Sequence, residues 1–122
     1  MQFVRRIFCL TLISLSMLFI VACSTAPEAP PEPTVIQVKL SEFAIDPSEI
    51  TVPPGIVTLD IENAGFVEHN IIIKELDQGV DFVYPEQTYS FSADLAPGTY
   101  TLVCTVEGHE AAGMVGTLTV AE

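Results

Sequence analysis

From residue 34 to the C-terminus, short apolar runs alternate with turn residues at nearly regular spacing. Ile56–Glu62 shows the clearest pattern, because apolar and polar residues alternate there with a period of two, as in a half-buried strand. Segments such as Pro53–Gly55 and Leu95–Gly98 separate the runs. This organisation is typical of an all-β sandwich or barrel. The predicted strands cover residues 35–40, 49–52, 56–62, 69–76, 81–84, 88–93, 99–104 and 114–121.

The strand predicted at residues 99–104 has an informative order of side chains. Tyr100, Leu102 and Cys104 share one face, because side chains alternate along a strand. An aromatic residue and a leucine mark this face as the inner one, so we expect Cys104 to point inward near the strand's end. Tyr100 follows Pro97-Gly98-Thr99 and is predicted to form a tyrosine corner, whose hydroxyl group holds a Greek-key crossover.

The first residues of the chain indicate export rather than a folded domain. Arg5 and Arg6 precede an apolar run, Ile7–Val21, that is shorter than the roughly 20 residues a membrane-spanning helix needs. The sequence Ile-Val-Ala-Cys that ends at Cys23 resembles a bacterial lipoprotein box. Residues 1–22 are therefore predicted to be a lipoprotein signal peptide, and Cys23 the lipidated residue. An ordinary signal peptide, an uncleaved anchor and twin-arginine export stay open as alternatives.

Two further segments follow the predicted signal peptide. Residues 23–33 comprise the lipidated cysteine and a proline-rich tether without large apolar side chains, which should adopt an extended polyproline conformation. Residues 34–122 are predicted to form one small domain. A domain of this size buries only about 60% of its unfolded surface, so a bound metal would add useful stability.

Only one thiol remains in the predicted domain, since Cys9 belongs to the signal segment and Cys23 would carry lipid. Cys104 therefore has no disulfide partner there, and in an oxidising compartment a bound metal would protect it. All 16 acidic residues follow Cys23, with only Lys39 and Lys74 against them, which gives the mature chain a net charge of −14. This charge disfavours nucleic acid as a partner and would steer a basic protein. Solubility or a saline habitat explains it equally well.

Four side chains suit a single metal ion. Cys104, His109 and Met114 occur in one short segment, and His69, the only other histidine, lies 35 residues before Cys104. Two imidazoles, a thiolate and a weak axial thioether are the ligands of a blue-copper electron-transfer site. The soft sulfur ligands favour Cu(I) and imidazole suits Cu(II), so the mixed set holds both oxidation states. Taken singly, each residue has an ordinary structural explanation, such as a buried, inert cysteine.

Three motifs together resemble the cupredoxins, the small blue-copper proteins. They are Gly98-Thr-Tyr-Thr-Leu-Val-Cys104, the Cys-x4-His-x4-Met loop that begins at Cys104, and Asn63-x5-His69-Asn70. The resemblance covers residues 34–122. It implies an eight-stranded Greek-key β-sandwich that holds one type 1 copper ion near one end.

The resemblance also implies a role for each residue of the site. The two histidines and Cys104 would form a trigonal plane around copper, and Met114 would supply the long axial bond. Asn70 would tie the strand of the first histidine to the cysteine loop near Thr105. The loop spacing is longer than in plastocyanins and azurins and is nearer to that of rusticyanin-like members, while the tethered form is similar to that of the auracyanins.

We therefore expect an extracytoplasmic blue-copper protein, lipid-anchored to a bacterial membrane on the periplasmic or outer face, that carries single electrons. Its partner would be a cytochrome or a membrane oxidoreductase, which docks at His109 through an apolar patch of Gly108, Ala111, Ala112 and Gly113. We expect the protein to be a monomer. We also expect no enzymatic activity, because four protein ligands leave no open position on the ion. The alternatives are a copper carrier that uses the same ligands and an adhesion module whose ligands are accidental.

Overall fold

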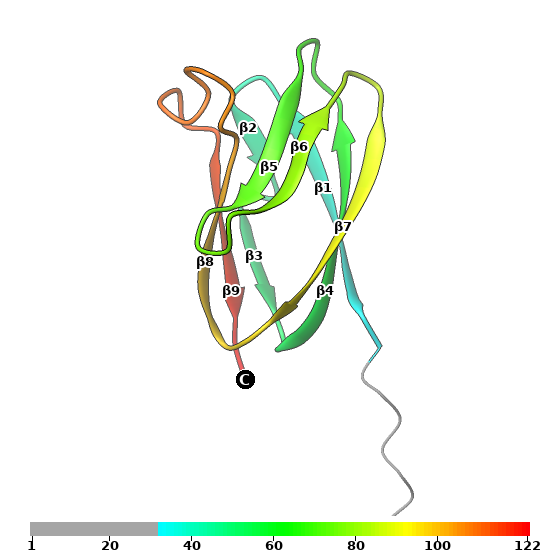
Figure 1. Cartoon of the computed structure of the whole chain (residues 1–122), viewed down its shortest axis with the longest axis vertical. Coiled ribbons are helices and arrows are strands. Elements are labelled where there is room, and N and C mark those ends of the chain that lie inside the picture. The colour runs from blue at the N-terminus through cyan, green and yellow to red at the C-terminus, as the bar shows by residue number, and fades with distance from the viewer. Residues whose placement is uncertain (1–31) are drawn as a thin grey trace, which may run out of the picture.

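The computed structural model describes residues 32–122, which form nine strands and no helix within that range. The strands lie in two facing sheets, and the long loop between the last two strands projects from one end (Figure 1). Their bounds are β1 Thr34–Ser41, β2 Ala44–Asp46, β3 Glu49–Val52, β4 Gly55–Asn63, β5 His69–Ile73, β6 Gln78–Val83, β7 Thr88–Leu95, β8 Gly98–Val103 and β9 Val115–Val120.

The order of strands confirms the predicted all-β Greek-key sandwich. One sheet has the order β2-β1-β4-β7 and the other the order β3-β9-β8-β5-β6. Most neighbouring strands are antiparallel, but β1 pairs with β4 and β3 pairs with β9 in parallel. These parallel pairs join strands that are not consecutive along the chain, so the chain must cross between the layers.

The number of strands differs from the predicted eight because the structure contains an additional one, β2. It has only three residues, pairs with the end of β1, and buries a single side chain, Ile45. Three residues with one buried position are too few to show an alternating pattern. The additional strand makes the turn between β1 and β2 a tight one, formed by Glu42 and Phe43.

The start of β6 also differs from the expectation. The predicted strand covers residues 81–84, but β6 begins at Gln78, and Gln78 and Gly79 pair with Ile73 and Ile72. A Cβ atom at Gly79 would lie 2.0 Å from the carbonyl oxygen of Ile71. Glycine therefore permits a close approach of two strands here, which the sequence alone does not distinguish from a turn.

The core follows from the alternation of side chains. Val57, Leu59 and Ile61 of β4 are each at most 2% exposed, while the residues between them face outward or are half-buried. In β8, Leu102 and Cys104 beyond its end are fully buried, as the alternation predicts. Burying such a leucine or isoleucine side chain contributes about 1.5–3 kcal/mol, so these positions supply much of the domain's stability.

The predicted tyrosine corner is confirmed. The hydroxyl group of Tyr100 donates a hydrogen bond of 2.9 Å to the carbonyl oxygen of Ala96, across the turn that joins β7 to β8. This contact makes Tyr100 a structural residue, because it fixes the direction in which β8 leaves the turn.

The predicted signal peptide (residues 1–22), the lipidation site Cys23 and residues 24–31 of the tether lie outside the described residues. Within residues 32–122, no helix is long and apolar enough to cross a membrane.

A buried asparagine organises the segment between β4 and β5. The Asn63 side chain is fully buried, and its amide group donates hydrogen bonds of 2.7 Å to the carbonyl oxygens of Val67 and Val83. Its side-chain oxygen accepts a third bond, of 2.9 Å, from the backbone N–H of Gly65. One side chain thus holds the turn that leads directly into His69.

Replacing this asparagine tests its structural role. We expect Asn63→Ala to lower the free energy of unfolding by about 1–3 kcal/mol, because buried backbone groups lose their only side-chain partner. Chemical denaturation of the metal-free protein measures this change. Gln37→Ala, which removes a single exposed hydrogen bond to Asp60, serves as the control and should change the free energy by less than about 0.5 kcal/mol. Equal effects of the two substitutions would contradict the assignment.

Candidate metal centre

The pairing of two strands brings the predicted ligands together. His69 is the first residue of β5, and Cys104 directly follows β8. The two strands are antiparallel neighbours, with Ile72 opposite Val103, so the start of β5 lies beside the end of β8. His69 and Cys104, which are 35 residues apart in the sequence, are therefore neighbours in space.

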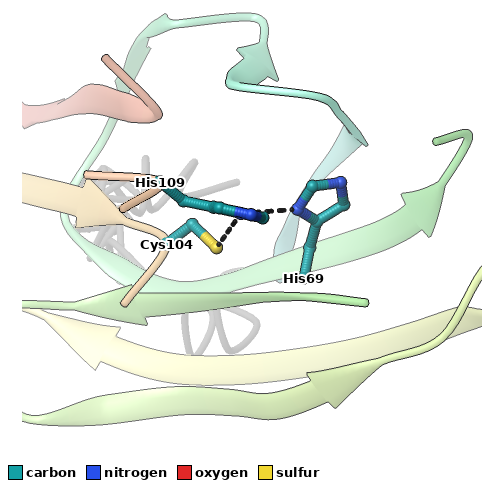
Figure 2. A group of neighbouring side chains, drawn as sticks. All are labelled: His69, Cys104 and His109. Carbon is teal, nitrogen blue, oxygen red and sulfur yellow. Dashed lines mark hydrogen bonds between the residues drawn. The ribbon is translucent and has the colours of Figure 1, made fainter. Parts of the chain in front are cut away.

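The three polar candidates converge on one point. Figure 2 shows the imidazole of His109 between the imidazole of His69 and the thiol of Cys104. The Nδ1 atoms of the two histidines are 3.2 Å apart, and Sγ of Cys104 is 3.4 Å from Nδ1 of His109. All three ligand atoms lie within 4.8 Å of one another.

These distances fit ligands that share one ion. Metal–nitrogen bonds of about 2.0 Å and metal–sulfur bonds of about 2.3 Å, at angles between tetrahedral and trigonal, separate neighbouring ligand atoms by roughly 3.3–3.7 Å. The observed separations between His109 and its two neighbours are close to this range. One thiolate and two imidazoles form a donor set that suits copper, and a small rearrangement would admit the ion.

Met114 closes the loop that carries the other ligands. It is fully buried, and its carbonyl oxygen accepts a hydrogen bond of 3.1 Å from the backbone N–H of Cys104. Its own N–H donates a bond of 3.0 Å to the carbonyl oxygen of His109. The backbone of Met114 therefore forms hydrogen bonds with both Cys104 and His109. These bonds place its thioether in the core at the same end of the sandwich.

Two glycines allow this loop to fold back on itself. Gly108 and Gly113 have φ angles of +83° and +100°, which side chains disfavour. Each flanks the short turn in which the N–H of Ala112 donates to the carbonyl oxygen of Gly108. The turn holds His109 half-buried, with Ala111 and Ala112 exposed around it.

Asn70 links the strand of His69 to the cysteine loop. Its side-chain amide donates to the hydroxyl group of Thr105 at 2.8 Å, and its side-chain oxygen accepts from the backbone N–H of Thr105 at 2.7 Å. The backbone N–H of Asn70 also points at Sγ of Cys104, 3.5 Å away. Asn70 thus connects β5 both to the loop after Cys104 and to the sulfur itself.

The environment of His69 favours the neutral imidazole. Burial lowers the pKa of His69, the nearby His109 lowers it further, and the negative charge of Glu42 opposes both effects. Its Nε2 atom is buried and has no hydrogen-bond partner among the described residues. A neutral imidazole is the state that coordinates a metal, so the site is prepared for binding through Nδ1.

Two residues near the site were not predicted from the sequence. The ring of Phe43 contacts the ring of His109 edge to face, with centroids 5.4 Å apart, and Glu42 lies near His69. Both residues belong to the turn between β1 and β2. They lie 26 or more residues from any candidate ligand along the chain, and no local pattern connects them with the site.

The lowered pKa of His69 predicts how the stability of the metal-free protein depends on pH. The folded state disfavours protonation of His69, whereas the unfolded chain takes up a proton near pH 6.5. Stability should therefore fall as the pH drops below about 6.5, by at most about 1.4 kcal/mol per pH unit. Denaturation at pH 7.5 and pH 5.5 measures the loss. A His69→Gln variant should lose less, and an identical loss would assign the effect to other groups.

Comparisons with known proteins agree with this geometry. The profile of the cupredoxin-like domain matches residues 11–120. A plastocyanin from Nostoc punctiforme is 32% identical over 103 residues, which cover 69% of this chain and 72% of that protein. A plastocyanin from Scenedesmus fuscus is 37% identical over 89 residues, which cover 64% of this chain and 87% of that protein.

Solved structures show the same likeness. Dithionite-reduced auracyanin from the photosynthetic bacterium Roseiflexus castenholzii aligns with a TM-score of 0.64 and 27% identity, over 73% of this chain and 98% of that one. Auracyanin A from Chloroflexus aurantiacus, described as a "blue" copper protein, aligns with a TM-score of 0.63 and 25% identity, over 74% and 100%. His69, Cys104, His109 and Met114 are arranged as a type 1 copper site. With its fold, its site and these relatives, the chain belongs to the family of cupredoxin-like domains.

Proposed function

We propose that this protein is a carrier of single electrons, with one copper ion held by His69, Cys104, His109 and Met114. The convergence of two imidazoles and one thiol on a common point carries this proposal. The similarity to plastocyanins and to a "blue" copper auracyanin supports it. Bound copper would supply the one-electron couple between Cu(I) and Cu(II).

The protein's contribution is a rigid, dry surrounding. His69, Cys104 and Met114 are fully buried, which keeps water from the ligands. Two hydrogen bonds between Asn70 and Thr105 hold the cysteine loop against β5, and the hydrogen bond between Cys104 and Met114 closes that loop. Because little can move when an electron arrives, the cost of reorganisation is small.

His109 provides the route to a partner. It is the only one of the four proposed ligands that is partly exposed, and exposed small residues of its loop surround it. Phe43, 50% exposed, extends this apolar surface on the side of the β1–β2 turn. We infer that a redox protein docks here briefly, since small apolar contacts suit weak, short-lived encounters.

We also infer where the protein works and which partners it meets. The predicted signal peptide and Cys23 support an extracytoplasmic protein that is lipid-anchored to a bacterial membrane. The excess of acidic residues supports a basic docking surface on a cytochrome or membrane oxidoreductase. Nothing in the proposed site calls for a substrate, so we propose no enzymatic activity.

The visible absorption spectrum tests the metal centre directly. Residues 32–122, loaded with Cu(II), should show an intense blue band that arises from charge transfer between the Cys104 thiolate and copper. Cys104→Ser should lose the band completely, while Cys104→Ser and the unchanged protein should show similar circular dichroism. A colourless protein would remove the electron-carrier proposal. A blue protein that rapidly transfers its copper to an acceptor apoprotein would favour the copper carrier instead.

Salt dependence tests the proposed docking charge. The bimolecular rate of electron transfer to a basic cytochrome should fall about tenfold between 10 mM and 150 mM salt, because screening removes the attraction. Stopped-flow absorbance at the blue band measures the rate. An acidic cytochrome of similar potential should show the opposite trend. Equal behaviour of the two cytochromes would contradict a docking role for the acidic surface.

A further inference from the structure

The turn between β1 and β2 lies beside both histidines of the proposed copper site, although it contributes no ligand. Phe43 packs edge to face against the ring of His109, and Glu42, the residue before it, approaches His69. Phe43 has a φ angle of +62°, which is uncommon for a bulky side chain and costs free energy. The turn thus has an unfavourable backbone conformation. In this conformation Phe43 contacts His109 and Glu42 lies near His69.

Gly65 defines how Glu42 and His69 face each other. A Cβ atom on Gly65 would lie 2.6 Å from Oε1 of Glu42 and 3.1 Å from Nε2 of His69. The carboxylate and the imidazole edge therefore border the same small volume, and any side chain at position 65 would fill it. Because Gly65 has no side chain, none of its atoms separates the carboxylate from the imidazole.

The Nε2 atom of His69 needs an acceptor when a metal binds the ring. Coordination through Nδ1 leaves the ring proton on Nε2, and metal-bound histidines normally donate that proton to a carboxylate, a carbonyl group or water. Nε2 is buried and unpaired among the described residues, and such a donor is costly to leave unsatisfied. His69 therefore presents a buried nitrogen without a partner to the same small volume that the Glu42 carboxylate borders.

Glu42 is the better of the two acceptors at this position. Oδ1 of Asn63 would lie 3.2 Å from the same Cβ atom, but it already accepts the Gly65 N–H. Oε1 of Glu42 accepts the N–H of Phe66 at 2.5 Å, and a carboxylate has further lone pairs to offer. The Phe66 bond anchors the carboxylate beside the site, and a rotation of the exposed Glu42 side chain would bring a carboxylate oxygen to Nε2.

Glu42 carries a negative charge at neutral pH. Hydrogen bonds from the backbone, that of Phe66 above all, lower the pKa of its carboxyl group. A negative charge beside a copper ligand stabilises Cu(II) more than Cu(I), because the oxidised ion carries one more positive charge. The position of Glu42 thus bears on the redox couple as well as on the orientation of the ring.

We propose that Glu42 is a positioning residue of the copper site, which accepts the Nε2–H of His69 and lowers the reduction potential through its charge. This inference rests on the proposed electron-carrier function. It adds a residue that helps to set the reduction potential, and with it the driving force for electron transfer. His69 is the only one of the four proposed ligands to which this role assigns Glu42, so the proposal predicts an effect on the reduction potential without an effect on which ligands bind.

The reduction potential of Glu42→Gln tests this proposal. Glutamine keeps the length of the side chain and an acceptor oxygen for Phe66, and it removes only the charge. At a fixed applied potential, the ratio of Cu(I) to Cu(II) should rise about three- to tenfold relative to the unchanged protein. A tenfold change corresponds to a rise of about 59 mV in a one-electron potential. The blue band should keep its position and intensity.

Asp94→Asn is the matched control. Asp94 is exposed near the end of β7, opposite Ile56 at the start of β4, and thus at the end of the sandwich away from the β8–β9 loop (Figure 1). It removes the same charge far from the site, so its potential should stay close to that of the unchanged protein. Equal potentials for Glu42→Gln and Asp94→Asn would overturn the proposal.

A second variant separates charge from packing. Glu42→Asp keeps the charge on a shorter side chain, so its potential should lie between those of the unchanged protein and Glu42→Gln. A potential as high as that of Glu42→Gln, or higher, would overturn the assigned role of charge. Absence of a blue band in the unchanged protein would instead reject the electron-carrier function itself. The two failures are therefore distinguishable.

Discussion

The antiparallel pairing of β5 with β8 is the constraint on which the proposed site depends. This pairing sets the start of one strand beside the end of the other, and so sets His69 beside Cys104. The reciprocal hydrogen bonds between Asn70 and Thr105 extend the pairing beyond the last residue of β8. A shift of one residue in this register would turn His69 to the opposite face of the sheet, away from the sulfur.

The remaining geometry comes from contacts that fix loops at the same end of the sandwich. Asn63 holds the turn before His69 through three hydrogen bonds, two of them buried. The backbone bond between Cys104 and Met114 closes the ligand loop at its base. Each contact satisfies a polar group that would be costly to bury alone, so the fold and the site are stabilised by the same interactions.

The sequence predicted the parts of the molecule that repeat a pattern. Alternation along residues 56–62 and 99–104 was sufficient for the sandwich, and the side-chain order in β8 predicted that Cys104 points inward. The short strand β2 was missed because three residues show no period. The approach of Glu42 and Phe43 to the histidines depends on how a turn folds back across the end of the sandwich, which no local pattern encodes. The pairing of Gln78 and Gly79 was missed because glycine marks both turns and close strand approaches.

The division of the ligands between sheet and loop has a consequence for how such a protein can change. Cys104, His109 and Met114 belong to one continuous segment whose two ends are joined by a single backbone hydrogen bond, whereas His69 belongs to the sheet. The segment is therefore a module with a fixed base. Insertion, deletion or transplantation of residues within it would reshape three sides of the metal site at once and leave the strands unaltered. A protein engineer could exchange this module between scaffolds, and natural variation in its length could diversify the family without a new fold.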